Sequence, residues 1–397
     1  MTAYLDNAAT TKVSASVFEK MKSVFLTDFG NPSSMHRIGM DAEQYIKESK
    51  GIISKILKCD PSEIVFTSGG TEANNTALIG AALANNRKGK HIITTRMEHA
   101  SVYNPLLFLE SMGYEITFAP VDKEGHVILD ELTGLVRDDT IIVSVMVVNN
   151  EIGSVNDPGV ISKAVKAKNP NIIFHADAIQ AFGKMSIIPK NSGIDLLSVS
   201  GHKIQGPKGS GFLYIRKGVK VKPIIYGGGQ EKGMRSGTEN VPAIAGLGQA
   251  AKDAYDNLEA NREKMYALKE RLIKGLLTLD KVSVHTFGKS GEEIPDLAAK
   301  IRLTAPHIVS CGFEGLSRSE VLLHALEDKQ VYVSSGSACS SNHPDISGTL
   351  KATGVEDKYL NSTLRFSFAL TTTEEEIDLA LDSLRELLPV LRKYTRK

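Results

Sequence analysis

The sequence predicts an α/β fold in which a mostly parallel sheet carries helices on both faces. Between about residues 60 and 220, short apolar runs of strand length alternate with stretches of helical periodicity. Parallel neighbours need a crossover connection, usually a helix, so this alternation favours parallel pairing. The predicted strands are "EIVFTS" (63–68), "HIITT" (91–95), "EITFAPV" (115–121), "TIIVSVMVV" (140–148), "NIIFHADA" (171–178) and "DLLSVS" (195–200).

Helices are expected between several of these strands and again beyond them. One is predicted near residues 100–112 and another over "DPGVISKAVKAKN" (157–169). After the Gly-rich stretch 226–242, a long helical segment over roughly 240–278 leads into a second, smaller unit. That unit is predicted to contain "VSVHTF" (282–287), "HIVSCGF" (307–313), a helix near 317–328, "LRFSFAL" (364–370) and a final helix that begins after "TTTEEE" (371–376).

Composition narrows the classes of protein and of partner. The 397 residues are 42% hydrophobic and carry a formal net charge of +1, so direct binding to nucleic acid or to an anionic membrane is not expected. The longest apolar run, 141–148, is too short to span a bilayer, and no signal peptide is expected. The three cysteines are widely spaced, which predicts a cytoplasmic protein without a disulfide framework.

Three glycine-containing stretches are candidates for binding phosphate. The stretch 201–211 lacks the P-loop pattern because Pro207 interrupts it, and 227–233 lacks the last glycine of the dinucleotide pattern. "TSGGTEANN" (67–75) lies between a predicted strand and a predicted helix, where free N–H groups and the Thr71 hydroxyl could hold one phosphate. The alternative for this stretch is a Gly-rich turn without a ligand.

Polar side chains follow two of the predicted buried strands. Asp177 ends one strand, while Ser200, His202 and Lys203 follow the next. A buried carboxylate and a buried lysine are costly unless they are paired, so a structural ion pair is one reading. A metal site that uses His175 and Asp177 is another, although no third ligand is evident. Pyridoxal phosphate would use all of these groups at once, with Lys203 as the Schiff-base lysine and Asp177 against the pyridine nitrogen.

A series of motifs then gives a resemblance to a known family. The chain resembles the pyridoxal-phosphate-dependent cysteine desulfurases, which are class V aminotransferase-like enzymes of fold type I. The resemblance covers residues 5 to about 370. It rests on "LDNAATT", "FGNPSSMHRIG", "FTSGGTEANN", "EHAS", "NNEIG", "HADAIQ", "SGHKIQGPKG", "GGGQEKGMRSGTENV" and "SSGSACSS". The last motif is similar to the group that supplies sulfur for iron–sulfur clusters and tRNA thiolation.

This resemblance implies a fold and a division of the chain. A large cofactor-binding domain with a mostly parallel, seven-stranded sheet is expected over residues 12–257. A smaller α+β domain is expected from residues 1–11 together with 258–397, and it would carry a mobile cysteine loop. A homodimer is also implied, because Thr238 matches a phosphate contact that is donated across a dimer interface.

The resemblance also assigns roles to matching positions. His99 would stack on the cofactor ring and take part in proton transfer, and Arg365 would hold the substrate carboxylate. Asn150 would lie near both the cofactor oxygen and that carboxylate. The remaining cofactor contacts implied are Gly70, Thr71, Asp177, Gln180, Ser200, His202 and Lys203. For His99 and Arg365 a purely structural role is the alternative, and Asn150 would otherwise cap the following turn.

Cys339 lies in the Ser- and Gly-rich stretch "YVSSGSACSSN" (332–342). The resemblance implies that L-cysteine binds to the cofactor, that Lys203 removes the Cα proton, and that the Cys339 thiolate takes the sulfur as a persulfide and leaves alanine. Small residues around the thiol would let it move between pocket and acceptor. An iron–sulfur scaffold or a tRNA-thiolating enzyme is the expected sulfur acceptor. The rivals are an aminotransferase, a selenocysteine lyase and a non-catalytic scaffold.

Overall fold

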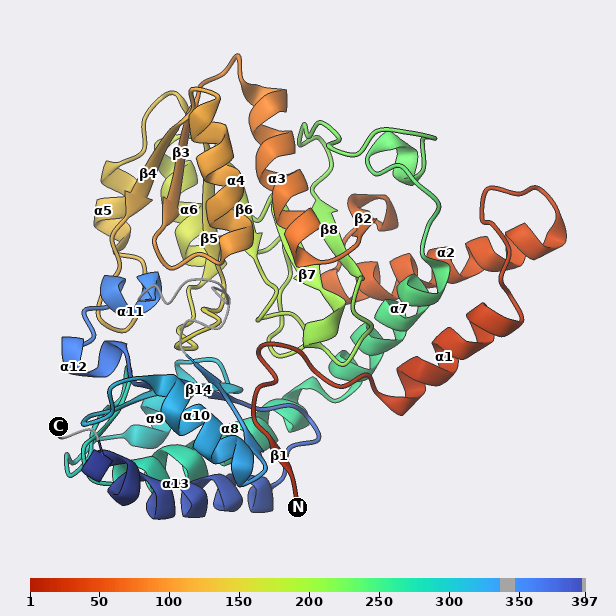
Figure 1. Ribbon diagram of the computed structural model, residues 1–397. Coiled ribbons are helices and arrows are strands. Elements are labelled where there is room, and N and C mark those ends of the chain that lie inside the picture. The colour runs from red at the N-terminus through yellow and green to blue at the C-terminus, as the bar shows by residue number, and fades with distance from the viewer. Residues whose placement is uncertain (336–346, 395–397) are drawn as a thin grey trace.

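A computed structural model describes residues 1–335 and 347–394 as a large α/β domain and a smaller α+β domain (Figure 1). The large domain holds a seven-stranded sheet in the order β2-β8-β7-β6-β5-β3-β4. The pairs from β7 through β6, β5 and β3 to β4 are parallel, and β8 is antiparallel to both of its neighbours. The strands are β2 (Ile64–Thr67), β3 (His91–Thr95), β4 (Glu115–Ala119), β5 (Thr140–Met146), β6 (Ile173–Asp177), β7 (Leu196–Ser200) and β8 (Gly211–Ile215). The predicted seven-stranded, mostly parallel sheet is confirmed.

Helices cover both faces of this sheet, because successive strand residues point to opposite sides. Ile142 and Leu196 pack with α3 (Gly70–Asn85) and α4 (Ala100–Ser111) on one face. Their sequence neighbours Val143 and Leu197 join a second cluster with α6 (Pro158–Lys168) and α7 (Val241–Asp256) on the other face. The remaining elements of this domain are α1 (Ala15–Leu26), α2 (Arg37–Leu57), α5 (Leu129–Gly134), η1 (Pro61–Glu63), η2 (Gly201–Lys203) and η3 (Glu231–Gly233).

Helix boundaries follow local capping groups. The Asp157 carboxylate accepts from the first-turn N–H groups of α6, and Thr373 and Glu376 satisfy each other's backbone N–H at the start of α13 (Glu374–Tyr394). The helical segment expected over roughly 240–278 is present as two consecutive helices. Asn257 leaves the helical region (φ −130°, ψ 33°) and separates α7 from α8 (Leu258–Leu277).

The small domain is built on an antiparallel sheet in the order β10-β9-β11-β14-β13. Its strands are β9 (Val282–Val284), β10 (Gly288–Lys289), β11 (Ile308–Phe313), β13 (Ser334–Ser335) and β14 (Thr363–Ser367). Its helices, besides α8 and α13, are α9 (Leu297–Arg302), α10 (Ser319–Asp328), α11 (Gly348–Ala352) and α12 (Asp357–Leu360). In the part of the chain that the structure describes, no helix is both long and apolar enough to cross a membrane.

The start of the chain lies against the small domain (Figure 1). Strand β1 (Ala3–Tyr4) pairs in parallel with β12 (Val331–Tyr332), and Asp6 forms a bridge with Ser367. The segment then runs on to the large domain, where the Thr11 hydroxyl donates to the His202 carbonyl oxygen. Residues 6–11 therefore cross between the two sheets beside the carboxyl ends of β6 and β7. The domain boundaries at residues 11/12 and 257/258 stay a prediction.

Candidate active site

A cavity of about 260 Å³ lies where the carboxyl ends of β5, β6 and β7 meet the N-termini of α3 and α4. This is the edge at which open α/β sheets bind ligands. The small domain contributes Arg365 to the lining, and the N-terminal segment contributes Ala8 and Ala9. Ten residues predicted from the sequence line it together: Gly70, Thr71, His99, Asn150, Asp177, Gln180, Ser200, His202, Lys203 and Arg365.

Lys203 ends the short helix η2, and its amine enters the cavity beside the N-terminal segment. The Nζ atom donates to the Ala9 carbonyl at 2.6 Å and to the Ala8 carbonyl at 2.7 Å. A second lysine, Lys184, contacts the backbone of Lys203: its Nζ donates to the Lys203 carbonyl at 2.9 Å. Burial lowers the pKa of Lys184 to about 7, and the nearby Lys203 adds to this effect. The amine of Lys203 is therefore held at a defined point of the cavity wall.

Asp177 ends β6 and is almost fully buried, with 4% of its surface exposed. Its Oδ2 accepts from Asn74 Nδ2 at 2.8 Å and its Oδ1 accepts from the Ile179 N–H at 2.9 Å. Burial raises the pKa of this carboxyl despite those donors and the nearby positive charge of Lys203. A protonated ring nitrogen would supply the cationic partner that this buried carboxylate favours, so the group fits a pyridoxal ring.

The N-terminus of α3 forms a cradle suited to a phosphate. Gly69 precedes the helix with φ 149°, and no side chain caps the helix N–H groups. A Cβ on Gly70 would lie 2.2 Å from Cδ1 of Ile179, so the Ile179 side chain, which lines the cavity, would have to move aside. Ser200 and His202 line the same cavity, and burial lowers the pKa of His202 to about 4. Backbone donors and neutral polar side chains thus surround the place where a dianion would bind.

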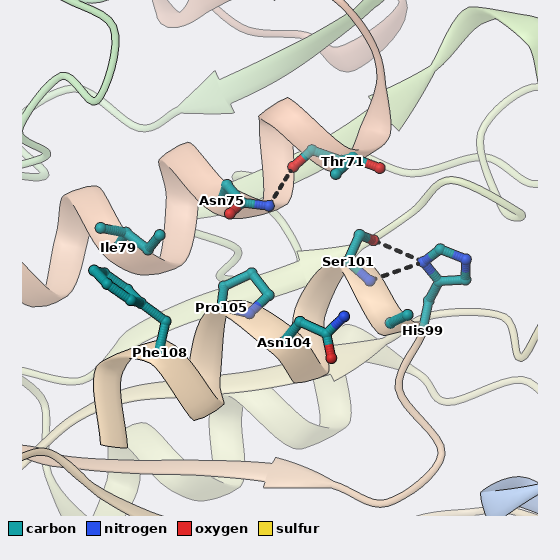
Figure 2. Close-up of a pocket in the computed structure, with 9 residues that line it drawn as sticks. Thr71, Asn75, Ile79, His99, Ser101, Asn104, Pro105 and Phe108 are labelled. Atoms are coloured by element: carbon teal, nitrogen blue, oxygen red, sulfur yellow. Dashed lines mark hydrogen bonds between the residues drawn. The ribbon is translucent and has the colours of Figure 1, made fainter. Parts of the chain in front are cut away.

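His99 caps α4 and joins a hydrogen-bonded chain that reaches Asp177. Its Nδ1 accepts from the Ser101 N–H at 3.1 Å and lies 2.8 Å from the Ser101 hydroxyl. Asn74 Nδ2 donates to that hydroxyl oxygen at 2.9 Å and to the Asp177 carboxylate. An open groove of about 520 Å³ lies between α3 and α4. Figure 2 shows His99 and Ser101 at one end of it, with Thr71 on the facing helix. Sequence reasoning assigned no role to Asn74 or Ser101, although both lie within motifs that it singled out.

Arg365, on β14, brings a guanidinium group to the cavity in addition to the amine of Lys203. Its Nη1 donates to the Asn150 carbonyl at 2.8 Å, and its Nη2 donates to Asp6 Oδ1 at 2.9 Å. The side chain is almost fully buried, and its Nε has no hydrogen-bond partner within the described residues. A second carboxylate, such as that of an amino-acid substrate, would complete the guanidinium's hydrogen bonding.

Two predicted residues are not placed in this cavity. Cys339 lies outside the described residues, although both flanks of its segment are described. Ser334 pairs with Arg365 across β13 and β14, and the Ser347 hydroxyl donates to Glu151, the neighbour of Asn150. Thr238 lines a separate cavity of about 120 Å³ that also contains Ser68 and Arg235. A single chain therefore does not bring Thr238 to the predicted phosphate site.

The fold and the site are those of an α/β enzyme whose catalytic pocket lies at the carboxyl ends of the strands. In this chain a lysine, Lys203, and a carboxylate, Asp177, share that pocket. The described residues contain no group of three or more His, Cys, Asp or Glu side chains that could hold a metal ion. His175 Nδ1 lies 2.8 Å from the Ser144 hydroxyl and its Nε2 lies 3.0 Å from the Ser198 hydroxyl, and His175 does not line the cavity. Asp177 and Lys203 both do, so these contacts favour the organic-cofactor interpretation over a metal site that uses His175 and Asp177.

Comparisons with known proteins identify the family. A model of the class V aminotransferases matches residues 3–380. Cysteine desulfurase IscS of Methanosarcina thermophila is 43% identical over 99% of this chain and 93% of its own length, and the same enzyme of Klebsiella pneumoniae is 41% identical over 99% and 94%. A solved NifS-like protein superposes with a TM-score of 0.90 at 35% identity, covering 98% of this chain and all of its own. A structure described as SspA in complex with cysteine gives 0.79 at 32% identity over 94% of this chain and 100% of its own.

The chain belongs to the class V aminotransferase family and, within it, to the cysteine desulfurases. Members of this family depend on pyridoxal phosphate.

Proposed function

We propose that this chain is a pyridoxal-phosphate-dependent cysteine desulfurase that converts L-cysteine to L-alanine. One observation carries the proposal: Lys203, Asp177 and Arg365, which come from three separate parts of the sequence, line the same 260 Å³ cavity. Cysteine desulfurases at about 40% identity over nearly the full length support it, and so does the structural neighbour described in complex with cysteine. An aminotransferase would share the lysine and the carboxylate but would have no use for Cys339.

Nine residues of the cavity would contact the cofactor, with His99 stacked on its ring and Asn150 near its oxygen. Gly70, Thr71, Ser200 and His202 would bind its phosphate, Asp177 its ring nitrogen, Gln180 its phenolic oxygen, and Lys203 its aldehyde carbon. When bound, pyridoxal phosphate supplies a protonated ring that stabilises the electron pair left on the substrate Cα. Asp177 keeps the ring nitrogen protonated, because a full negative charge in this buried position is favoured by an adjacent cation.

Binding and proton transfer fall to the chain's own residues. Arg365 binds the substrate carboxylate through its guanidinium, and Asn150 lies beside it in the cavity wall. Lys203 takes the Cα proton at Nζ, where the Ala8 and Ala9 carbonyls hold the amine in place. His99 would be a second proton carrier, with its ring orientation set by Ser101.

Cys339 would be the nucleophile for sulfur. Its thiolate forms a bond to the substrate sulfur while the carbon–sulfur bond breaks, and the carbon then takes a proton to give alanine. The product on the enzyme is a persulfide. Both flanks of the segment support this role, because Ser334 lies beside Arg365 and Ser347 bonds to Glu151.

The proposal also includes the oligomeric state of the chain and the protein that accepts its sulfur. The chain would act as a cytoplasmic homodimer in which Thr238 completes the partner subunit's phosphate site. The separate location of Thr238 in one chain supports this arrangement. The persulfide would pass to an iron–sulfur scaffold or a tRNA-thiolating enzyme.

Mass spectrometry of the Cys339 peptide tests the proposed function. After incubation with L-cysteine, one added sulfur is expected on Cys339, and none on the same peptide in a Cys339→Ala variant. Cys59→Ala is the matched control, because burial raises the pKa of Cys59 to about 12 and keeps that thiol protonated. Added sulfur on another cysteine, or alanine release at the normal rate from Cys339→Ala, would contradict the assignment.

A further inference from the structure

His307 is a buried histidine that contacts a predicted cofactor residue from the opposite domain. It directly precedes β11 in the small domain and is 1% exposed. Its Nε2 lies 3.1 Å from Oε1 of Gln180, which belongs to the large domain and lines the cavity. His307 itself is absent from the cavity lining, so it does not touch a ligand there.

The hydrogen bonds around Gln180 determine which way its amide faces. Gln180 Nε2 lies 2.9 Å from the Ala8 carbonyl oxygen, which can only accept. The amide nitrogen must therefore face Ala8, and the amide oxygen faces His307. That oxygen is also an acceptor, so the hydrogen on the His307 ring must be on Nε2. The donor sequence runs from His307 to Gln180 and from Gln180 to Ala8.

The other ring nitrogen agrees with this assignment. His307 Nδ1 is buried and has no hydrogen-bond partner within the described residues. With the hydrogen on Nε2, Nδ1 is a bare lone pair. The opposite tautomer would bury an unpartnered N–H and place two acceptors 3.1 Å apart. Burial and the positive charges of Lys184, Lys269, Arg365 and Lys203 hold the pKa of His307 well below its usual value. The ring therefore stays neutral with one fixed donor.

We propose that His307 is a positioning residue that locks the Gln180 amide with its nitrogen toward the cavity. Gln180 has two amide hydrogens, and Ala8 takes one. The second is then offered to the cavity, which suits an anionic oxygen on the bound group. A reversed amide would present its own oxygen and repel such a ligand.

The same residue couples this contact to the substrate-binding strand. The His307 carbonyl accepts from the Phe368 N–H at 2.9 Å, just beyond β14, which carries Arg365. A shift of the small domain would therefore act on Arg365 and on the Gln180 amide together. This inference rests on the proposed function, since it takes the phenolic oxygen of pyridoxal phosphate as the anionic acceptor.

Binding of pyridoxal phosphate to the apoenzyme tests the proposal. His307→Leu removes the donor, and we expect the dissociation constant to rise by roughly tenfold, the loss typical of one hydrogen bond to a charged acceptor. His307→Gln places an N–H near the position of Nε2, and affinity within about twofold of wild type is expected. His285→Leu is the matched control. His285 is also a buried histidine of the small domain, but its Nε2 lies 2.9 Å from the Thr363 hydroxyl and not beside Gln180. The affinity of His285→Leu for pyridoxal phosphate should equal that of wild type.

A double-mutant cycle separates positioning from packing. In a Gln180→Leu background, His307→Leu should cause no further loss of affinity, because the residue acts through the amide. Additive losses, or wild-type affinity in His307→Leu, would overturn the proposal. If His307→Leu does not fold, His307→Asn replaces it: its shorter side chain should weaken binding where His307→Gln does not, and equal affinities would overturn the proposal. Failure of the wild-type protein to bind pyridoxal phosphate would instead refute the proposed function.

Discussion

Arg365 and Asp6 form an ion pair of 2.9 Å between residues 359 positions apart in the chain. The pair joins the crossing N-terminal segment to β14 at the edge of the cavity. Arg365 donates a second guanidinium hydrogen bond to the Asn150 carbonyl, which belongs to the large domain. Arg365 is thus held by both domains before any substrate arrives, and little conformational entropy remains to be lost when a carboxylate binds.

Replacing Arg365 with lysine tests this binding role. Lysine keeps the charge but cannot bond to Asp6, Asn150 and a carboxylate in one planar geometry. We expect the KM for L-cysteine to rise about 10–100-fold with little change in cofactor content. Steady-state kinetics and the visible absorption of the bound cofactor measure the two effects. Arg392→Lys is the control, since within the described part of the chain Arg392 donates to the Glu314 and Lys281 carbonyls of the small domain. An unchanged KM in Arg365→Lys would refute the role.

Replacing Asp177 with asparagine removes the buried negative charge but nearly keeps the shape. We expect kcat to fall by about 10²–10³-fold, because a neutral amide no longer stabilises a protonated ring nitrogen in a site of low dielectric constant. Asn74→Ala is a useful comparison, because it removes only one donor to this carboxylate and should cost less. Equal activity of wild type and Asp177→Asn would show that Asp177 is a structural residue.

Gly70→Ala tests the phosphate cradle. The added Cβ would lie 2.2 Å from Cδ1 of Ile179, so this flexible side chain must shift within the cavity wall, at a cost near the lower end of the roughly 1–3 kcal/mol that overpacking causes. We expect a lower melting temperature and weaker binding of pyridoxal phosphate. Gly51→Ala in α2 is the matched control: nothing lies within 4 Å of its added Cβ, and alanine favours the helix by about 0.5–1 kcal/mol. If Gly70→Ala binds pyridoxal phosphate as tightly as wild type, the N-terminus of α3 does not bind the phosphate as proposed.

Lys269 gives a prediction for stability against pH. It is fully buried, donates to Thr304 and Ala305, and burial lowers its pKa to about 7 from an ordinary value of 10.5. Below pH 7 the Lys269 amine is protonated in both the folded and the unfolded chain, so the folded protein bears the full free-energy cost of burying its charge. Between about pH 7 and 10.5 the unfolded chain binds more protons than the folded one, and stability rises with pH.

Lys269→Met should remove this pH-dependent contribution. We expect wild type to gain on the variant by up to about 1.4 kcal/mol per pH unit from pH 7 to pH 9. Urea unfolding midpoints of both holoenzymes at the two pH values provide the measurement. Parallel pH profiles would mean that Lys269 stays protonated in the folded protein.

Local patterns were sufficient to predict much of the fold. The mostly apolar stretches 140–148 and 195–200 contain β5 and β7, whose residues are buried because both faces of these strands are covered. The break at Asn257 was missed, since helical periodicity continues on both sides and no Gly or Pro marks it. Helices α1 and α2 were not predicted, although both pack against α7, a contact that depends on tertiary structure.

The candidate site was predictable where a motif carries the chemistry, as at Lys203 and Asp177. The supporting contacts were not. Asn74 and Ser101 are ordinary polar residues whose role appears only when α3 and α4 bring them beside Asp177. His307 lies 127 positions from Gln180, so their contact follows from the docking of two domains and leaves no local signal.

The most direct test of the account is to find the lysine that carries the cofactor. Reduction of the holoenzyme with borohydride converts the lysine–cofactor linkage to a stable amine, and peptide mass spectrometry then locates it. The account predicts the pyridoxyl group on Lys203. Lys184 is the sharpest alternative, because it lies directly beneath Lys203 and its pKa is lowered to about 7. A pyridoxyl group on Lys184, or on no lysine at all, would contradict the central claim.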